Sequence, residues 1–153
     1  MRIRKARLTD AAVIARFNHN LAWETERIRL KPRTVALGVR ALLNDPAKGT
    51  YFVAEQDGKV IGQLLVTYEW SDWRNGKFWW IQSVYVAPEF RRAGVFSRLF
   101  NHVNDVARAR RSVCGLRLYV EKNNRRAQNA YQRLGLKPTH YQIYETCFRA
   151  FHS

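Results

Sequence analysis

Apolar residues along this chain follow two different periods, and the two periods alternate. Apolar side chains at every third or fourth position, the spacing of one helical face, recur over residues 13–21, 35–43, 95–106 and 127–134. Stretches of strand length with alternating or continuous apolar residues lie at 2–8, 50–55, 60–70, 77–86, 116–120 and 141–148. The predicted order of elements is therefore β-α-α-β-β-β-α-β-α-β.

Capping and turn residues separate these elements. Thr9-Asp10 offers a helix N-cap, Pro32 begins a second helix, and Gly135 ends the last one. Gln56-Asp57-Gly58-Lys59 and Asn75-Gly76 are predicted hairpin turns, the second with only two residues between its strands. Hairpins in the first half and crossover helices in the second predict an α/β fold with a mixed sheet.

The junction after the stretch 77–86 has the chemistry of an anion site. This stretch is nearly all apolar, so we expect a central strand that is covered on both faces. Arg91-Arg92-Ala93-Gly94 follows it and leads into a predicted helix. A helix N-terminus presents free backbone N–H groups with partial positive charge, and Gly94 lets a phosphate approach the backbone closely. Taken alone, these residues fit either a phosphate-binding loop or a plain basic turn.

Composition narrows the class of protein. A chain of 153 residues, 46% of them apolar, suits one domain with its own core, which we take as residues 1–153. No apolar run is long enough to cross a membrane and the charged N-terminus is unlike a signal peptide, so we expect a cytoplasmic protein. Cys114 and Cys147 lack metal-ligand spacing, and we expect no metal.

The formal net charge of +15 implies attraction to anions. On charge alone the anion is nucleic acid, a membrane surface or a polyphosphate cofactor. The chain has no recognised nucleic-acid-binding motif, and its aromatic residues lie in strand-like core stretches. Specific nucleic-acid binding is therefore the weaker alternative.

Two further observations come from motifs on either side of the third predicted helix. Residues 83–96 read SVYVAPEFRRAGVF, and residues 118–127 read LYVEKNNRRA, with Tyr131 and Gly135 following. The first stretch is similar to the central strand and [Q/R]-x-x-G-x-[G/A] loop of the GNAT superfamily of acetyl-CoA-dependent N-acetyltransferases. The second is similar to that family's N-x-x-A-x-x-x-Y-x-x-x-G signature. In this order and spacing, the motifs make almost the whole chain resemble that family.

The resemblance implies a GNAT-like acyl-CoA N-acyltransferase fold and acetyl-CoA as cosubstrate. In the family, backbone N–H groups of the loop hold the CoA pyrophosphate, and the pantetheine arm pairs with the central strand as an added strand would. The arginines of the loop would add positive charge. The cofactor-binding residues implied in this way are Val84, Tyr85, Val86, Arg91, Arg92, Ala93, Gly94, Val95, Phe96, Ser97, Asn124 and Ala127.

Phe96 departs from the family pattern, which has a small residue at that position. Backbone N–H donation needs no side chain, so the site survives if the ring points away from the ligand. Phe100 lies one helical turn further on, which favours a Phe96 ring turned towards the core. A ring lying across the mouth of the loop would count against the cofactor site.

Tyr131 is, by the same resemblance, the general acid that gives a proton to the departing CoA thiolate. A phenol suits this role because the reference pKa values of phenol and thiol differ by only about 1.5 units. The alternative is a core tyrosine packed beside Ala127 and Leu134. A backbone N–H of the central strand, at Val84 or Tyr85, would polarise the thioester carbonyl. The reaction implied is direct acetyl transfer, in a ternary complex, to a primary amine of an unidentified small molecule or protein.

A general base is not obvious, because Trp80 stands where some family members have a glutamate on the central strand. If Asn75-Gly76 is a two-residue turn, Glu69 lies opposite Gln82 and Ser71 opposite Trp80, on a shared face of the sheet. Glu69 is therefore the candidate base. The alternatives are Asp72, Glu24, Glu26 and proton loss to water without a dedicated base.

Alternatives of a different kind also follow from the sequence. A CoA-binding sensor without catalysis is favoured by the missing strand glutamate, and a basic nucleic-acid-binding module is the weaker possibility. The tryptophans near the predicted hairpin either fill the core or wall an acceptor pocket; they are Trp70, Trp73, Trp79 and Trp80. A homodimer is a further prediction, with its interface on the last strand and the aromatic surface.

Overall fold

The structure is a computed structural model that describes residues 1–153. Five strands form one sheet in the order β1-β2-β3-β4-β5. Their bounds are Arg2–Lys5 for β1, Thr50–Gln56 for β2, Lys59–Ser71 for β3, Gly76–Val86 for β4 and Val113–Arg117 for β5. β1 to β4 pair antiparallel in turn and β5 joins β4 in parallel, which confirms the mixed α/β sheet.

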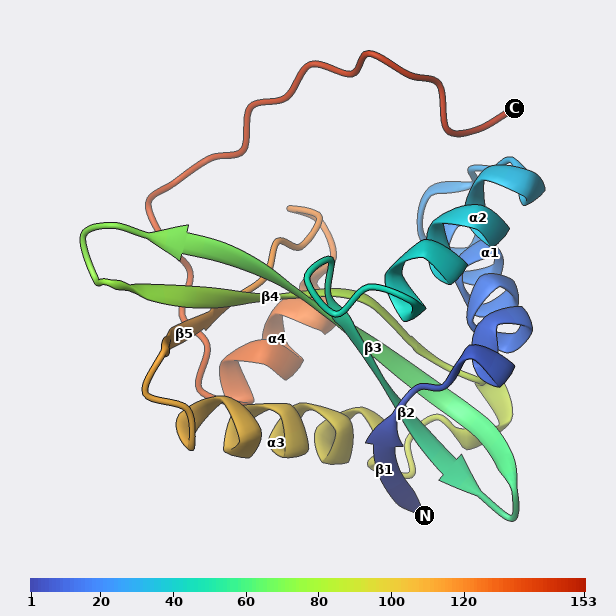
Figure 1. Cartoon of the computed structure of the whole chain (residues 1–153), viewed down its shortest axis with the longest axis horizontal. Helices are drawn as coiled ribbons and strands as arrows, with labels where there is room; N and C mark the ends of the chain where they lie inside the picture. Colours follow the sequence, from blue (N-terminus) through green and yellow to red (C-terminus); the bar gives the residue numbers. More distant parts are fainter.

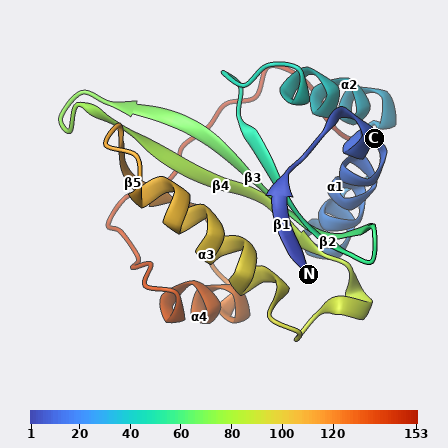
Figure 2. The same ribbon diagram turned by 60° about the horizontal axis from the view of Figure 1, so that its bottom comes forward.

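Helices cover both faces of this sheet (Figure 1). On one face lie α1 (Ala11–Glu26) and α2 (Pro32–Leu43), whose Ile14 and Val39 are buried against the sheet. On the other face lies α3 (Val95–Arg108), with α4 (Arg125–Arg133) beside it in Figure 2. Short 3-10 turns occupy Leu8–Asp10 and Pro88–Phe90.

The larger part of the core lies between α3 and the sheet. Leu99 and Val103 of α3 are fully buried against apolar side chains of β2, β3 and β4. The strong apolar periodicity of this helix is therefore explained by burial of one face, which supplies most of its stability. No helix is both long enough and apolar enough to cross a membrane.

β4 and β5 run side by side for only part of their length. Their pairing ends at Trp80 and Arg117, whereas β4 continues to Val86. Residues 81–86 of β4 therefore lack a strand neighbour on that side, and a gap opens between β4 and the chain that follows β5. This gap adjoins the N-terminus of α3, because β4 leads through Pro88–Phe90 into that helix.

The hairpin between β3 and β4 differs from the predicted two-residue turn. Ser71 pairs with Gly76, so the loop contains four residues, 72–75. The Asp72 carboxylate accepts a hydrogen bond from the backbone N–H of Trp73 at 3.0 Å, and the Arg74 N–H donates to the Ser71 carbonyl at 3.2 Å. This local bonding competes with the Asn-Gly turn and moves the register by four residues.

The register change relocates the candidate base. Glu69 lies opposite Phe78 rather than Gln82, and Thr67 rather than Ser71 lies opposite Trp80. Because side chains alternate with a period of two, Glu69 keeps the predicted face of the sheet. It stands four positions nearer the hairpin loop than expected, a displacement of roughly 13 Å along the strand.

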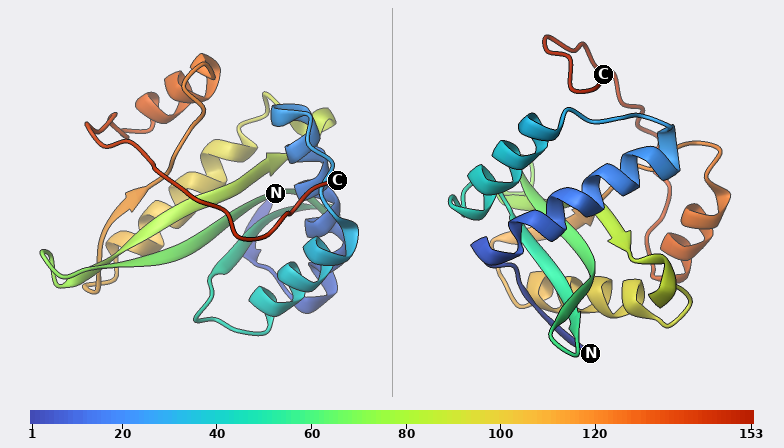
Figure 3. Two further views of the ribbon diagram at one scale, coloured as in Figure 1. Left: turned by 90° about the horizontal axis from the view of Figure 1, so that it is seen from above. Right: turned by 90° about the vertical axis from the view of Figure 1, so that its right-hand side faces the viewer.

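The C-terminal part of the chain differs from expectation in two ways. β5 begins at Val113, three residues before the predicted 116–120, and its Gly115 packs closely against the Phe78 ring of β4. The expected last strand, 141–148, is not formed. Residues 137–153, here called the tail, run extended across the molecule (Figures 1 and 3), and only their end is tied down, where Ser153 N–H donates to the Arg29 carbonyl at 3.0 Å.

Candidate active site

A β-bulge in β4 shapes the gap between β4 and β5. Leu65 pairs with Gln82 and Gln63 with Tyr85, so one extra residue is inserted on β4. Ser83 in this bulge has a positive φ of 49°, a left-handed conformation that costs a non-glycine residue about 1–2 kcal/mol. Such strain persists only where surrounding contacts hold it in place.

The bulge decides which backbone groups face the gap. Ala87 N–H donates to the Ile61 carbonyl of β3 at 2.9 Å. Alternate residues of an antiparallel strand bond to the same neighbour, so Tyr85 also directs its backbone groups at β3. Val84 and Val86 then direct theirs into the gap, and the Val86 carbonyl is reached there by the Arg91 side chain. The gap therefore has one exposed backbone edge.

A buried amide holds the bulge from β3. The Gln63 side chain is fully buried, and its Nε2 donates to the Ser83 carbonyl at 3.1 Å and to Asn18 Oδ1 at 2.8 Å. Asn18 in turn donates to the Tyr51 hydroxyl at 3.1 Å. Buried polar groups are costly unless they are bonded, so this chain of contacts specifies one arrangement of the strained residue.

The N-terminus of α3 closes one end of the gap. Gly94 is the N-cap residue with a φ of 74°, and Arg92 before it also has a positive φ, 65°. A Cβ on Gly94 would meet no atom within 4 Å, so there is free space in front of the loop. The first N–H groups of a helix have no partner within it. Backbone donors and open space thus coincide at the predicted pyrophosphate site.

Phe96 turns its ring away from this loop, as predicted. Its side chain is half-buried and packs on the core beneath α3. The ring centroids of Phe96 and Phe100 are 6.2 Å apart, and the Tyr131 ring meets Phe96 edge-on at 5.8 Å. The large side chain therefore joins α3 to α4 and leaves the loop open.

Tyr131 and Asn124 occupy the positions on α4 that the motif indicated. The Asn124 side chain accepts a hydrogen bond from the Ala127 N–H at 3.1 Å, which confirms the helix cap. Tyr131 is half-buried, and this burial raises the pKa of its hydroxyl above the usual value. A phenol with a raised pKa keeps its proton at neutral pH and is available as a proton donor.

The Arg91 side chain forms an ion pair with Glu24, whereas the sequence predicted that it binds the cofactor. Its guanidinium donates to Glu24 Oε2 at 2.7 Å and to the Val86 carbonyl at 2.9 Å. Glu24 also accepts from the Tyr85 hydroxyl at 2.8 Å. Burial, and then the Glu24 carboxylate, raise the pKa of that hydroxyl. Glu24 of α1 is thus engaged by the end of β4, while Arg92 remains exposed at the loop.

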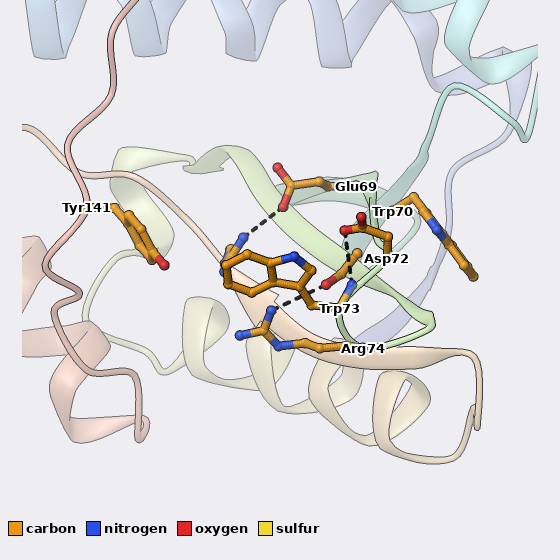
Figure 4. Close-up of a pocket in the computed structure, with 8 residues that line it drawn as sticks. Glu69, Trp70, Asp72, Trp73, Arg74 and Tyr141 are labelled. Atoms are coloured by element: carbon orange, nitrogen blue, oxygen red, sulfur yellow. Dashed lines mark hydrogen bonds and ion pairs between the residues drawn. The ribbon is translucent and has the colours of Figure 1, made fainter.

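A pocket lies at the hairpin end of β3 and β4, beside Glu69 of β3 (Figure 4). The Glu69 carboxylate accepts from Arg117 Nη1 of β5 at 2.8 Å, and its side chain is 44% exposed. Figure 4 shows Tyr141 of the tail reaching in beside the hairpin residues. The pocket is lined by Glu69, Trp70, Ser71, Asp72, Trp73, Arg74, Arg117 and Tyr141.

The four tryptophans of the hairpin region divide between core and surface. Trp79 is buried under α3, and Trp80 is half-buried with its ring 6.0 Å from that of Tyr119. Trp70 and Trp73 are exposed and line the pocket. No group of three or more histidine, cysteine, aspartate and glutamate side chains suited to a metal ion occurs in the structure.

Comparison with known proteins decides the family. A sequence profile of the acetyltransferase (GNAT) family matches residues 15–136. This chain belongs to the GNAT acetyltransferase family. The protein is therefore an enzyme that transfers acyl groups, and acetyl-CoA is the acyl donor of its family.

Three relatives place the acetyltransferase within this family. The solved structure of a possible acetyltransferase from Clostridium difficile 630 is 46% identical, with a TM-score of 0.92, and the match covers 97% of this chain and 98% of that chain. The uncharacterized N-acetyltransferase YhfO of Bacillus subtilis (strain 168) is 27% identical over 88% of this chain and 89% of its own length. The thialysine N-epsilon-acetyltransferase of Bos taurus is 32% identical over 59% of this chain, and that match spans only 52% of the bovine protein.

Sequence reasoning missed two contributors to the acetyltransferase site. In the sequence Gln63 is distinguished only as a polar residue within an apolar strand. Its hydrogen bond to the Ser83 carbonyl is visible only in the tertiary structure. Glu24 was weighed only as a base, although it binds Arg91 and Tyr85. In the structure Tyr131 of α4 contacts Phe96 of α3, and β4 leads directly into the N-terminus of α3, whereas Glu69 lies outside the gap, where β4 and β5 are still paired.

Proposed function

We propose that this acetyltransferase transfers the acetyl group of acetyl-CoA directly to a primary amine in a ternary complex. One observation carries the proposal: an exposed backbone edge at Val84 and Val86 leads to a helix N-terminus that opens onto free space at Gly94. An extended thioester cofactor with a pyrophosphate fits this combination of strand edge and anion site. The acetyl donor supplies an activated carbonyl and a thiolate leaving group.

The residues of the gap take separate roles in this proposal. N–H groups of residues 92–97 hold the pyrophosphate, and the backbone of Val84 and Val86 holds the pantetheine arm. Of the two backbone N–H groups considered for the thioester carbonyl, we choose Val84, because Tyr85 faces β3. Tyr131 gives its proton to the leaving thiolate. The homodimer and the cytoplasmic location stay predictions.

The general base remains a proposal of its own. The Glu69 carboxylate shares a face of the sheet with Gln82 but lies near the level of Phe78. We propose that it takes the amine proton through a relay of several waters, because the six residues from Phe78 to Val84 span roughly 20 Å of strand, and that the pocket beside it receives the end of the acceptor remote from the reacting amine. The aromatic walls of this pocket suit an apolar amine or a cation held over a ring.

Replacement of Glu69 by glutamine tests this role. We expect kcat/KM for the amine to fall by at least about tenfold at neutral pH, within the range of general base catalysis. The deficit should shrink as the pH approaches the pKa of the amine itself, about 10 for an alkylamine, because solution then removes the proton. The measurement is a pH profile of kcat/KM, with Asp72→Asn as a control in the same pocket. A deficit that is constant with pH contradicts the assignment.

Replacement of Gln63 by leucine tests the support of the bulge. The variant leaves the Ser83 carbonyl and Asn18 Oδ1 without their buried donor, so the free energy of unfolding should fall by about 1–3 kcal/mol. The kcat should fall as well, because the Val84 N–H loses its fixed direction. Asn18→Ala is the control, since it disturbs the same network without touching Ser83. An unchanged kcat in Gln63→Leu would show that the bulge holds without this amide.

Binding and turnover test the function as a whole. Acetyl-CoA at about one hundred times its Kd should stabilise the protein by about 2.7 kcal/mol, seen as a rise in Tm. ATP serves as the control anion, because a +15 chain attracts polyphosphates without a specific site. Primary amines should then release free CoA. Equal Tm shifts with ATP and acetyl-CoA refute the site, and a specific shift without CoA release indicates a sensor.

A further inference from the structure

The Arg91 side chain occupies a backbone group that the proposed cofactor needs. Its Nε donates to the Val86 carbonyl at 2.9 Å, and its guanidinium lies over the Tyr85 ring, 5.3 Å from the ring centroid. The Val86 carbonyl belongs to the exposed edge to which we assign the pantetheine arm. An added strand bonds to such an edge through the same carbonyl oxygens, so the arm and Arg91 compete for this acceptor.

Glu24 of α1 holds Arg91 in this position. Glu24 Oε2 accepts a hydrogen bond from Arg91 Nη2 at 2.7 Å, while Glu24 Oε1 accepts from the Tyr85 hydroxyl at 2.8 Å. The Tyr85 side chain is buried, and its ring centroid lies 4.9 Å from that of Phe17. The carboxylate is therefore fixed by a buried side chain of β4, and it fixes in turn an arginine whose side chain is 37% exposed.

The pyrophosphate loop offers Arg91 a second anionic partner. Arg91 directly precedes residues 92–97, to which we assign the pyrophosphate. An ion pair between exposed side chains contributes little to stability. Arginine binds phosphate through two parallel hydrogen bonds, and a pyrophosphate carries more negative charge than a single carboxylate. A pyrophosphate at the loop therefore competes successfully with Glu24 for the guanidinium.

We propose that the ion pair between Arg91 and Glu24 is an autoinhibitory latch that acetyl-CoA opens. In the free enzyme the latch covers the Val86 carbonyl and ties the end of β4 to α1. When acetyl-CoA binds, the guanidinium leaves Glu24 and Val86 for the pyrophosphate, and the pantetheine arm takes the vacated carbonyl. Glu24 is thus a positioning residue that acts on the cofactor through Arg91. The inference rests on the proposed use of acetyl-CoA.

Replacement of Glu24 by glutamine is the first test. The amide oxygen of glutamine can still accept from the Tyr85 hydroxyl, but the negative charge that holds Arg91 is removed. The Kd for acetyl-CoA, measured by isothermal titration calorimetry, should therefore fall by about two- to fivefold, the range of a surface ion pair. Damage to the site would weaken binding instead, and thermal unfolding verifies the fold. An unchanged or higher Kd overturns the proposal.

Glu89→Gln is the matched control for the loss of negative charge. Glu89 is also exposed, and it lies in the 3-10 turn two residues before Arg91 without forming an ion pair with it. This variant should leave the Kd for acetyl-CoA close to that of the wild type. An equal fall in Kd for Glu24→Gln and Glu89→Gln would indicate a general effect of charge and would refute the latch.

A double-mutant cycle tests whether Glu24 acts through Arg91. Arg91→Gln should raise the Kd for acetyl-CoA by about tenfold or more, because the pyrophosphate loses a charge-assisted hydrogen bond. In this background, replacement of Glu24 by glutamine should have no further effect, since there is no guanidinium left to release. If Glu24→Gln lowered the Kd equally with and without Arg91, the two residues would act independently and the latch would be wrong.

Failure of the proposed function would give a different result from failure of the latch. In the first case the wild type binds acetyl-CoA no more tightly than ATP, and both proposals are refuted. In the second case acetyl-CoA binds specifically, but its Kd does not respond to Glu24→Gln or responds to it independently of Arg91. Only the latch is then refuted.

Discussion

Replacement of Tyr131 by phenylalanine is expected to lower kcat by about 10²- to 10⁴-fold, the range for loss of a general acid. The phenylalanine ring can keep the edge-on contact with Phe96, so acetyl-CoA binding and the free energy of unfolding should change little. Only the hydroxyl and its proton are removed. The measurement is steady-state kinetics with acetyl-CoA and an amine acceptor, together with the acetyl-CoA dependence of Tm.

The pH profile adds a second measure of the same role. Burial raises the pKa of Tyr131, so the proton-donating form is present at every pH below that raised value. The wild type should therefore show no loss of kcat from this group below about pH 10, the ordinary value for a phenol. Tyr119→Phe is the control, because Tyr119 is an exposed tyrosine next to Trp80. Equal kcat values in Tyr131→Phe and wild type would leave Tyr131 as a packing residue only.

Replacement of Gly94 by alanine should weaken acetyl-CoA binding by about 10- to 150-fold, which corresponds to loss of one charge-assisted hydrogen bond of about 1.5–3 kcal/mol. The added methyl group would point into the free space in front of the loop and keep the pyrophosphate from the backbone. The expected change is in the KM and Kd for acetyl-CoA, with less effect on kcat.

Gly58 provides a matched control for this experiment. It also has a φ of 74° and no atom within 4 Å of a built Cβ, but it lies in the turn between β2 and β3. Alanine in either position should cost about 1–2 kcal/mol of stability from the left-handed conformation. Only Gly94→Ala should raise the KM for acetyl-CoA. If both variants raised the KM for acetyl-CoA equally, the weaker binding would result from lower stability and not from the change in the pyrophosphate loop.

The hairpin shows where local sequence rules stop. Asn75-Gly76 is a strong turn signal, yet Asp72 bonds to the backbone of Trp73 and the four-residue loop forms instead. Both turns satisfy the alternation of apolar residues, because the two registers differ by an even number of positions. The sequence could therefore predict which face of the sheet carries Glu69, but not which residue of β4 lies opposite it.

The tail shows a different limit. The composition of 141–148 is that of a strand, but a strand exists only when another strand is available beside it. Within one copy, the backbone contact between Phe151 and Lys31 leads the tail past β5. Pairing between distant segments depends on where the chain ends are anchored, which no local pattern records.

The sequence by itself determined the four helices, five of the six predicted strands, the mixed sheet, the helix cap at Asn124 and the turn of Phe96 towards the core. Most of these depend on periodicity or on neighbours within one helical turn. Only the tertiary structure decided that Gln63 holds the strained Ser83, that Arg91 binds Glu24, and that β4 and β5 separate after Trp80. These features join residues 20 or more positions apart in the chain. Their energies come from burial and hydrogen-bond geometry, which exist only once the sheet and its helices have packed.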